Sequence, residues 1–252
     1  MRRIFHQGLL WIALLFPPLI FAPAGAAETG AKRVSPQELA QMLAEGKQPL
    51  LVNNMGLIEC LDHSIAGSIC IPSEELEKRI GELPPDKNRL MVFYCESETA
   101  QKSCEASDVA VRHGYTAVYV LDGGMPAWKR AGYATVAAER ITRRAIASVK
   151  APALRKMLTD KTAVLPVDIR SEIAFQKEHI EGAINLPMYQ LHRRWRELPL
   201  NRPLILVDSR GFRTPLAANY LAERGYNVRP LFGGMTSWEA MLAKEKKDAK
   251  RK

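Results

Sequence analysis

The segment GYTAVYVLDGGMPAWKRAGY, residues 114–133, decides the fold because its landmarks appear a second time later in the chain. The Gly-Gly-Met turn at 123–125 returns at 233–235, and the tryptophan after each turn, Trp128 or Trp238, returns with it. Other matches at a similar spacing are Gly114-Tyr115 with Gly225-Tyr226, Ile71-Pro72 with Leu186-Pro187, and Glu82-Leu83-Pro84 with Glu197-Leu198-Pro199. An internal repeat of roughly 110 residues predicts two copies of one domain, each able to bury its own core.

Each copy alternates short apolar runs with helical patterns. In the first copy RLMVFY at 89–94 precedes a helix expected from about Ser103 to His113, and AVYVL follows at 117–121. Another helix is expected over SEELEKRI, residues 73–80, with Ser73 as its N-cap. The second copy repeats the pattern with AVLPVDI, PLILVD, TPLAANYLAERG and VRPLF. Strands that are apolar on both faces and separated by helices predict an α/β fold, with a parallel sheet flanked by helices on both faces in each copy.

The overall composition is that of an ordinary globular protein. The chain has 252 residues, of which 47% are hydrophobic and 25% charged, and this excludes disordered and collagen-like chains. Four cysteines are too few for a scaffold built on disulfides. The formal charge of +9 favours anionic partners, although part of it lies in a basic tail at 243–252 that we expect to be a solvated, frayed end.

The first 26 residues are predicted to be a signal peptide. Arg2 and Arg3 precede an apolar run at 8–22, and the small residues at 22–27 offer a cleavage site. The alternative is an uncleaved membrane anchor, but Pro17-Pro18 interrupts the run, which is shorter than the ~20 residues that span a bilayer. We therefore expect a periplasmic protein, secreted through a cleavable signal, with no stable membrane insertion and no nucleic-acid partner.

The loop after RLMVFY is the candidate active site, because parallel sheets bind their ligands at the carboxyl ends of the strands. Cys95 comes directly after this run. A thiol beneath backbone amides that converge on a helix N-terminus lies in a positive field, which stabilises the thiolate and attracts an anion. Cys95 is therefore the candidate nucleophile, suited to a sulfur or phosphorus centre that bears negative oxygens. The candidate substrate-binding residues are Glu96, Ser97, Glu98, Thr99, Ala100, Gln101, Lys102 and Ser103.

The sequence holds no pattern that calls for a bound cofactor. No pair of cysteines or histidines stands at metal-ligand intervals on a predicted turn, and no glycine-rich phosphate loop follows a strand in either copy. We therefore expect neither a metal nor a cofactor.

At this point the sequence resembles a known family. HIEGAINLP at 179–187, the segment at 114–133 and a cysteine between a buried strand and a helix are together similar to tandem rhodaneses, a family of sulfurtransferases. The resemblance implies rhodanese-like domains at 34–136 and 151–242, joined by a linker at 137–150. It also implies a Cys95 persulfide that takes sulfur from a small anionic donor such as thiosulfate and gives it to cyanide or a thiol, including the thiol of a partner protein.

The second copy is degenerate by the standard of this family. The resemblance implies an active loop with a cysteine first, a glycine three residues on and an arginine five residues on. DSRGFRT matches at Gly211, Arg213 and Thr214, but Asp208 stands in the place of the nucleophile. Because a carboxylate carries no persulfide and repels an entering anion, we expect a structural or docking role for this copy, with Arg213 as the partner of Asp208.

The first copy departs from the family in another way. When the copies are aligned on Gly114-Tyr115, Lys102-Ser103 falls at the Arg-Ser position, seven residues after the cysteine rather than five. The wider loop that this spacing predicts favours a larger anion and keeps open an oxyanion phosphatase or arsenate reductase. The supporting residues also differ, since Asn53-Asn54-Met55 and Ser64 stand where the second copy has Asp168-Ile169-Arg170 and His179. These departures keep open a non-catalytic rhodanese-fold protein that binds or scaffolds.

All four cysteines lie in the first copy, and an exported protein often pairs an even set. Cys95 and Cys104 form the candidate disulfide because the loop folds back over its own start. Such a bridge would be a structural staple or a reversible redox switch. Cys60 and Cys70 are interpreted as small buried apolar residues.

Overall fold

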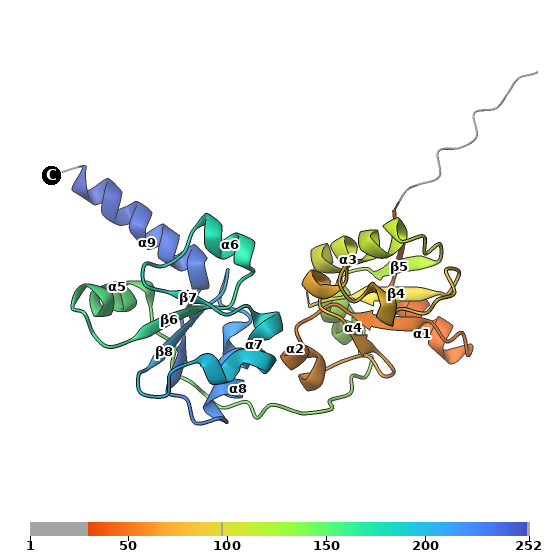
Figure 1. Cartoon of the computed structure of the whole chain (residues 1–252), viewed down its shortest axis with the longest axis horizontal. Coiled ribbons are helices and arrows are strands. Elements are labelled where there is room, and N and C mark those ends of the chain that lie inside the picture. The colour runs from red at the N-terminus through yellow and green to blue at the C-terminus, as the bar shows by residue number, and fades with distance from the viewer. Residues whose placement is uncertain (1–29, 97, 251–252) are drawn as a thin grey trace, which may run out of the picture.

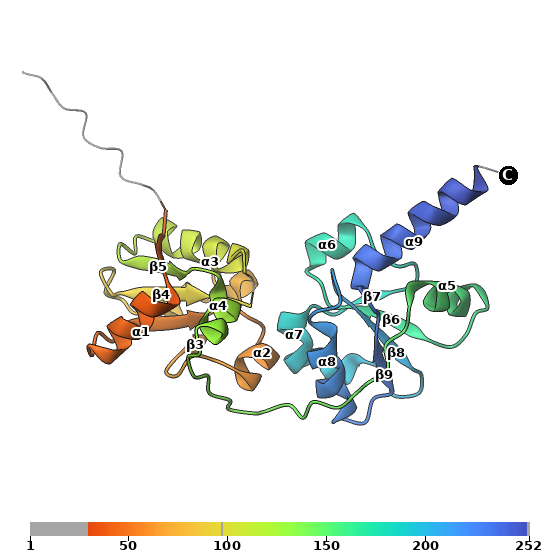
Figure 2. The ribbon, with the colours of Figure 1, turned by 180° about the vertical axis from the view of Figure 1, so that it is seen from behind.

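The computed structural model describes residues 30–96 and 98–250, so the predicted signal peptide and Ser97 lie outside the described residues. Figures 1 and 2 show two α/β domains side by side, joined by an extended linker. Each domain holds one parallel sheet with helices on both faces, which confirms the fold predicted from the apolar runs. No helix within the described ranges has the length and apolar character needed to cross a bilayer.

Domain 1 is built on a five-stranded parallel sheet with the order β1-β5-β4-β2-β3. Its core has two parts, one on each face of the sheet: α3 packs on one face, and α1 and α4 pack on the other. The strands are β1 (Lys32–Val34), β2 (Leu50–Asn53), β3 (Ile69–Cys70), β4 (Met91–Tyr94) and β5 (Val118–Leu121). The helices are α1 (Pro36–Ala44), α2 (Leu57–Asp62), α3 (Gln101–Arg112) and α4 (Gly124–Arg130).

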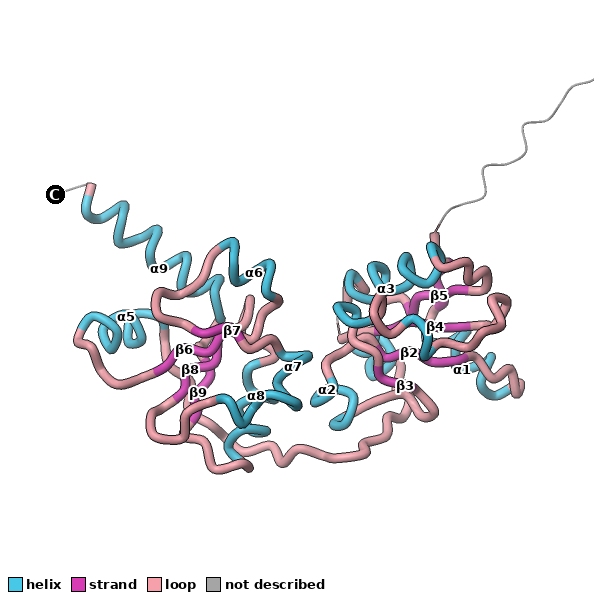
Figure 3. Tube along the Cα trace, viewed as in Figure 1, coloured by secondary structure: helices cyan, strands magenta, loops and turns pink. Residues whose placement is uncertain are grey.

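Domain 2 repeats this plan with a four-stranded parallel sheet in the order β7-β6-β8-β9. Figure 3 shows its strands in magenta between the surrounding helices, with α7 and α8 packing on one face and α5 and α9 on the other. The strands are β6 (Leu165–Asp168), β7 (Ile184–Asn185), β8 (Leu204–Val207) and β9 (Val228–Pro230). The helices are α5 (Ala151–Thr159), α6 (Glu172–Lys177), α7 (Met188–Arg194), α8 (Thr214–Ala222) and α9 (Gly234–Ala249).

The repeated tryptophans anchor the two cores. Trp128 and Trp238 are 4% and 5% exposed, each on the helix that follows its Gly-Gly turn. The indole N–H of Trp128 donates to the carbonyl of Ala134 at 2.9 Å, so its polar group is satisfied inside the core.

Helix α2 of domain 1 lies at the interface between the two domains. It packs against α7 and α8 of domain 2, and the side-by-side placement is visible in Figures 1 and 2. Ile58 of α2 is fully buried within the apolar cluster of domain 2. The corresponding position of domain 2 is Ile173 of α6, which is 80% exposed. The docking helix is therefore a specialised feature of domain 1.

Three expectations about helix limits are corrected by the structure. Residues 73–80 do not form one helix; the segment is divided between short 3₁₀ turns at Ser73–Glu75 and Ile80–Glu82, because Leu76 between them is buried against the core. Helix α3 begins at Gln101 rather than near Ser103. Helix α9 continues to Ala249, so most of the tail expected to fray is an exposed extension of that helix.

Candidate functional site

Cys95 lies at the carboxyl end of β4, where the sequence places it. Its carbonyl accepts a hydrogen bond from the amide of Met125 at 2.9 Å, and the whole residue is 1% exposed. The Sγ atom lies 3.6 Å from the hydroxyl oxygen of Ser103, on the first turn of α3. The hydroxyl of Ser103 also contacts the carbonyl of Ala100 at 2.8 Å. Ser103 thus connects the thiol to the start of the helix.

The loop after Cys95 is no longer than the loop of domain 2, which corrects the wider loop expected above. Strand β4 ends at Tyr94 and α3 begins at Gln101, while β8 ends at Val207 and α8 begins at Thr214, so six residues separate strand from helix in each domain. The two additional residues of domain 1 lengthen α3 instead. An alignment on Gly114-Tyr115, which follow the helix, does not show whether two additional residues lie in the loop or in the helix.

Counted from the strand, Ala100 rather than Lys102 occupies the position of the family's arginine. Ala100 is buried, and its φ of 54° is in the left-handed region. Its carbonyl accepts the amide of Cys104 at 2.9 Å and so begins the helix. The methyl side chain of Ala100 offers no hydrogen-bond donor to an anion. Any anion in this loop therefore depends on backbone amides and on the start of α3.

The charged side chains of this loop are paired with neighbours. The ammonium of Lys102, a candidate substrate-binding group, binds Glu74. Glu98 pairs with Arg130 at 2.5 Å. Gln101 donates to Glu105 at 3.0 Å. Thr99 is exposed in the turn between them.

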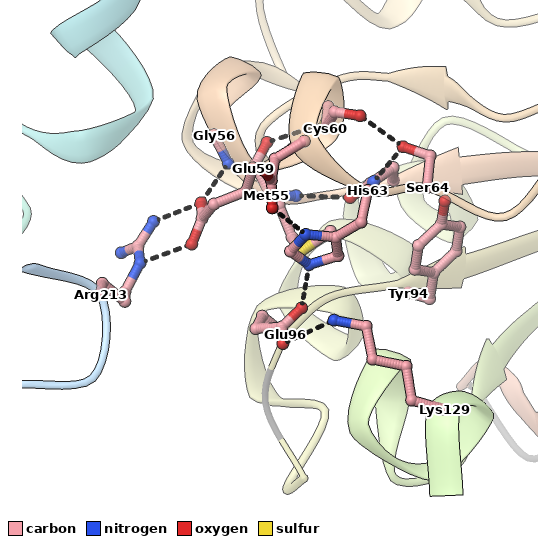
Figure 4. A network of polar contacts seen from close by, with 12 residues as sticks. Met55, Gly56, Glu59, Cys60, His63, Ser64, Tyr94, Glu96, Lys129 and Arg213 are labelled. Atoms are coloured by element: carbon pink, nitrogen blue, oxygen red, sulfur yellow. Dashed lines mark hydrogen bonds and ion pairs between the residues drawn. The ribbon is translucent and has the colours of Figure 1, made fainter. Parts of the chain in front are cut away.

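Glu96, the residue next to Cys95, is held by His63 and Lys129 (Figure 4). Its carboxylate oxygens lie 2.7 Å from Nε2 of His63 and 3.4 Å from the ammonium nitrogen of Lys129. Burial acts to raise the pKa of the Glu96 carboxyl, but His63 and Lys129 outweigh burial and lower that pKa. Glu96 is therefore a fixed anchor of the loop, and its charge is neutralised by its partners.

In domain 2 the carboxylate of Asp208 fills the position that an anion would occupy. It is 4% exposed and accepts the amides of Gly211, of Arg213 at 2.7 Å and of Thr214 at 3.2 Å. Gly211 has a φ of +82°, and a Cβ atom there would lie 2.8 Å from the amide nitrogen of Gly233. Only glycine fits this crowded left-handed position. The domain 2 loop thus keeps its anion-binding shape and supplies its own anion.

The side chain of Arg213 does not pair with Asp208 as expected; it crosses to domain 1. Its Nε and one terminal nitrogen donate to the two carboxylate oxygens of Glu59 on α2, at 2.8 and 2.7 Å (Figure 4). Glu59 also accepts the amide of Gly56 at 2.9 Å. Burial raises the pKa of Glu59, but Arg213 outweighs burial and the net pKa is lowered. The arginine was assigned to Asp208 because a sequence does not show which domain faces it.

The residues behind each loop differ as the sequence indicates. In domain 2, Asp168 and Arg170 form a close ion pair at 2.7 Å. In domain 1, Asn53 donates instead to the hydroxyl of Ser64 at 3.0 Å. Asn54 donates to a backbone carbonyl, and its Oδ1 is the single buried side-chain N or O atom without a partner among the described residues. Uncharged Asn53 and Met55 thus stand at the positions of the domain 2 ion pair, and the Asn54 amide between them is partly unsatisfied.

The disulfide is Cys60–Cys70, and the expected pairing of Cys95 with Cys104 is wrong. Cys60 lies on α2 and Cys70 on β3, and the pairing of β3 with β2 brings their Cα atoms to 6.2 Å. Cys95 and Cys104 are free thiols. The Sγ atom of Cys104 lies 3.9 Å from a guanidinium nitrogen of Arg33, while that of Cys95 contacts Ser103. The bridge ties the docking helix to the sheet and leaves the candidate nucleophile free.

The sequence patterns point neither to His63 and Glu59 nor to a cavity between the domains. His63 and Glu59 both lie on or beside α2, and neither matches a position of the family pattern. A cavity of about 370 Å³ also lies between the domains, lined by Glu74, Glu75, Lys78, Arg79, Tyr189, Gln190, Arg193 and Arg194. Among the residues that the structure describes, no cluster of histidine, cysteine and acidic side chains is arranged to hold a metal ion.

Comparison with known proteins identifies relatives of this fold and site. The chain is 37% identical over 82 residues to Thiosulfate sulfurtransferase GlpE of Shewanella oneidensis, covering 32% of this chain and 81% of that protein. It is 33% identical over 91 residues to a Sulfurtransferase of Allochromatium vinosum, covering 36% of this chain and 85% of that protein. A crystal structure of a thiosulfate sulfurtransferase from Pseudomonas aeruginosa matches at 20% identity with a TM-score of 0.38, over 81% of this chain and 43% of that chain.

The family model of the rhodanese-like domain matches twice, at residues 35–131 and 150–241. These two matches include both loops described above and every strand of the two sheets except β1. The chain therefore belongs to the rhodanese-like sulfurtransferase family, with two rhodanese-like domains in tandem.

Proposed function

We propose that this protein is a periplasmic sulfurtransferase in which Cys95 carries a sulfane sulfur from thiosulfate, or a related small anion, to a thiophilic acceptor. The Cys95 thiolate attacks the outer sulfur of thiosulfate; a new S–S bond forms, and sulfite leaves with the electrons of the broken S–S bond. Cyanide or a thiolate then attacks the outer sulfur of the persulfide. The products are thiocyanate or a new persulfide, and the Cys95 thiolate is regenerated.

The observation that carries this proposal is a free thiol at the end of β4 beside the first turn of α3. The amide dipoles of a helix stabilise negative charge at its N-terminus, and α3 is twelve residues long. The same position in domain 2 holds the Asp208 carboxylate, bound by three loop amides. This homologous arrangement supports the proposal that the domain 1 loop favours an anionic sulfur. Export is proposed from the amino-terminal pattern of Arg2, Arg3 and the apolar run at 8–22.

Thiocyanate formation tests this function directly. Reduced protein without its signal segment is incubated with thiosulfate and cyanide, and thiocyanate is measured for the wild type, Cys95→Ser and Cys104→Ser. We expect turnover in the wild type and in Cys104→Ser, and none in Cys95→Ser. Equal turnover in the wild type and Cys95→Ser would remove Cys95 from the mechanism.

A non-catalytic binding or scaffolding protein is the second candidate function. The observation that favours it is the 1% exposure of Cys95, which leaves a donor little access in this conformation. Intact mass after thiosulfate treatment separates the two candidates, because a gain of one sulfur atom on Cys95 requires access to the thiol. The phosphatase or arsenate reductase alternative loses its basis, since the lengthened loop on which it rested is not formed.

A further inference from the structure

The ring of His63 lies between two acidic side chains, and Figure 4 shows its contact with one of them, Glu96. Its Nδ1 lies 2.9 Å from a carboxylate oxygen of Asp62, and its Nε2 lies 2.7 Å from a carboxylate oxygen of Glu96. An ionised carboxylate only accepts hydrogen bonds, so both ring nitrogens must carry a proton. The geometry therefore favours the imidazolium cation, although its side chain is only 13% exposed.

The charges that face His63 come from four parts of the chain. Asp62 belongs to α2, Glu96 to the loop after β4, and Lys129 to α4, while Arg143 of the linker binds Asp62 at 2.5 Å. Burial lowers the pKa of His63, and Lys129 acts in the same direction, but Glu96 and Asp62 outweigh both and raise the pKa above its ordinary value. The imidazolium is therefore stabilised by this site.

Helix α2, which ends directly before His63, is fixed at both ends. Its first turn is bound to domain 2 through Glu59 and Arg213, and Cys60 ties it to β3 by the disulfide. At its other end, Asp62 accepts the amide of Ile141 from the linker at 3.1 Å. His63, next to this anchored helix, gives the loop after β4 a rigid support, and Glu96 is the loop residue that it binds.

We propose that His63 is a positioning residue for Cys95: as an imidazolium it holds Glu96, and through Glu96 it holds the chain directly after the thiol. This role rests on the proposed function and specifies how the nucleophile is held where Ala100 provides no guanidinium. The clamp has a defined pH response. Because the folded protein favours the protonated ring, the clamp is complete at acidic pH and is lost as the pH rises through the raised pKa of His63.

Alkylation of Cys95 tests this clamp without any sulfur donor. The rate of reaction with iodoacetamide is measured for Cys95 alone by peptide mass spectrometry, over the pH range in which histidines titrate. The variants are His63→Gln and Glu96→Gln, which break the clamp from either side. His113→Gln is the matched control, because His113 binds Glu77 at 2.7 Å on the surface, away from the loop.

At acidic pH we expect both clamp variants to be alkylated about tenfold faster than the wild type, which corresponds to the loss of one charge-assisted hydrogen bond. The ratio of variant to wild-type alkylation rates should fall to one as the pH rises through the pKa of His63. NMR of the wild type follows the titration of His63. The control should give a ratio of one throughout. A ratio that is one, or constant, at every pH for Glu96→Gln overturns the proposal, as does an equal effect of His113→Gln.

The same experiment keeps the two proposals apart. If the ratio of variant to wild-type alkylation rates changes with pH as predicted, but the wild type takes no sulfur from thiosulfate, the clamp is supported and the proposed function is contradicted. A wild type that transfers sulfur, with alkylation unchanged in both clamp variants, contradicts the clamp alone. Unfolding is excluded by the circular dichroism of each variant, and Glu96→Gln is the safer variant because its side chain is 35% exposed.

Discussion

The loops after β4 and β8 have the same length and opposite contents. Each places six residues between strand and helix. The domain 2 loop closes around its own carboxylate, Asp208, whereas the domain 1 loop begins with a free thiol, Cys95. The difference teaches that the residue at the strand end decides what the loop amides face: in domain 2 they bind the carboxylate of their own loop. The arginine of that loop binds Glu59 across the interface.

The largest expected effect is on sulfur transfer, when the residue that distinguishes the two loops is replaced. Replacing Cys95 by Ser removes the sulfur nucleophile, and we expect sulfur transfer to fall by roughly 10³-fold or more. The measurement is kcat/KM for thiocyanate formation. Asp208→Ala should leave kcat/KM within a factor of about three if domain 2 has no part in the chemistry. Loss of activity in Asp208→Ala as large as in Cys95→Ser would show that the two loops share the reaction.

The next effect concerns the task that Arg213 performs at the interface. Removing it by Arg213→Ala leaves the buried Glu59 carboxylate without its partner, which costs about 3 kcal/mol of unfolding free energy. Arg193→Ala is the matched control, because its partner Glu75 is also across the interface but the Arg193 side chain is 53% exposed. We expect the control to cost less than about 1 kcal/mol. Urea unfolding measures both, and equal losses would contradict the assignment of Arg213 as the main polar link between the domains.

A smaller effect is expected from the disulfide that holds the docking helix in domain 1 and has no counterpart in domain 2. The double variant Cys60→Ser, Cys70→Ser opens a short loop, which we expect to cost about 2 kcal/mol. Thermal unfolding with and without reductant measures the loss. Reductant should lower the melting temperature of the wild type but leave that of the double variant unchanged. The same shift in both would place the redox sensitivity elsewhere.

The smallest effect expected is on acid stability. The pKa of Glu59 is lowered in the folded protein, so its pairing with Arg213 stabilises the fold above the pKa of the unfolded state and is lost as the pH falls through the lowered value. Glu59→Gln should therefore be less stable than the wild type near neutrality and approach it in acid. Urea unfolding as a function of pH measures this convergence, and a constant difference at all pH values would contradict it.

The sequence contains enough information for the fold and for the contents of each loop. The repeated Gly-Gly-Met turns and tryptophans predict two α/β domains, and DSRGFRT predicts the degenerate loop, because these patterns are local. The partners of Lys102 and Arg213 are distant in the chain, and a sequence spacing does not show them. The partner of Cys60 is only ten residues away, but four cysteines in one domain leave the pairing open. His63 stands one residue before Ser64, the position at which domain 2 has His179. An acidic residue before it and another after Cys95 were the only signals of its role.

The most direct test of the central claim is the mass of the protein after thiosulfate. Reduced wild type and Cys95→Ser are treated with thiosulfate, freed of small molecules and compared by intact mass and peptide mapping. The account predicts one added sulfur atom in the wild type, located on the peptide that contains Cys95 and removed by cyanide, and no addition to Cys95→Ser. An unchanged wild-type mass, or an added sulfur on Cys104 that persists in Cys95→Ser, would contradict it.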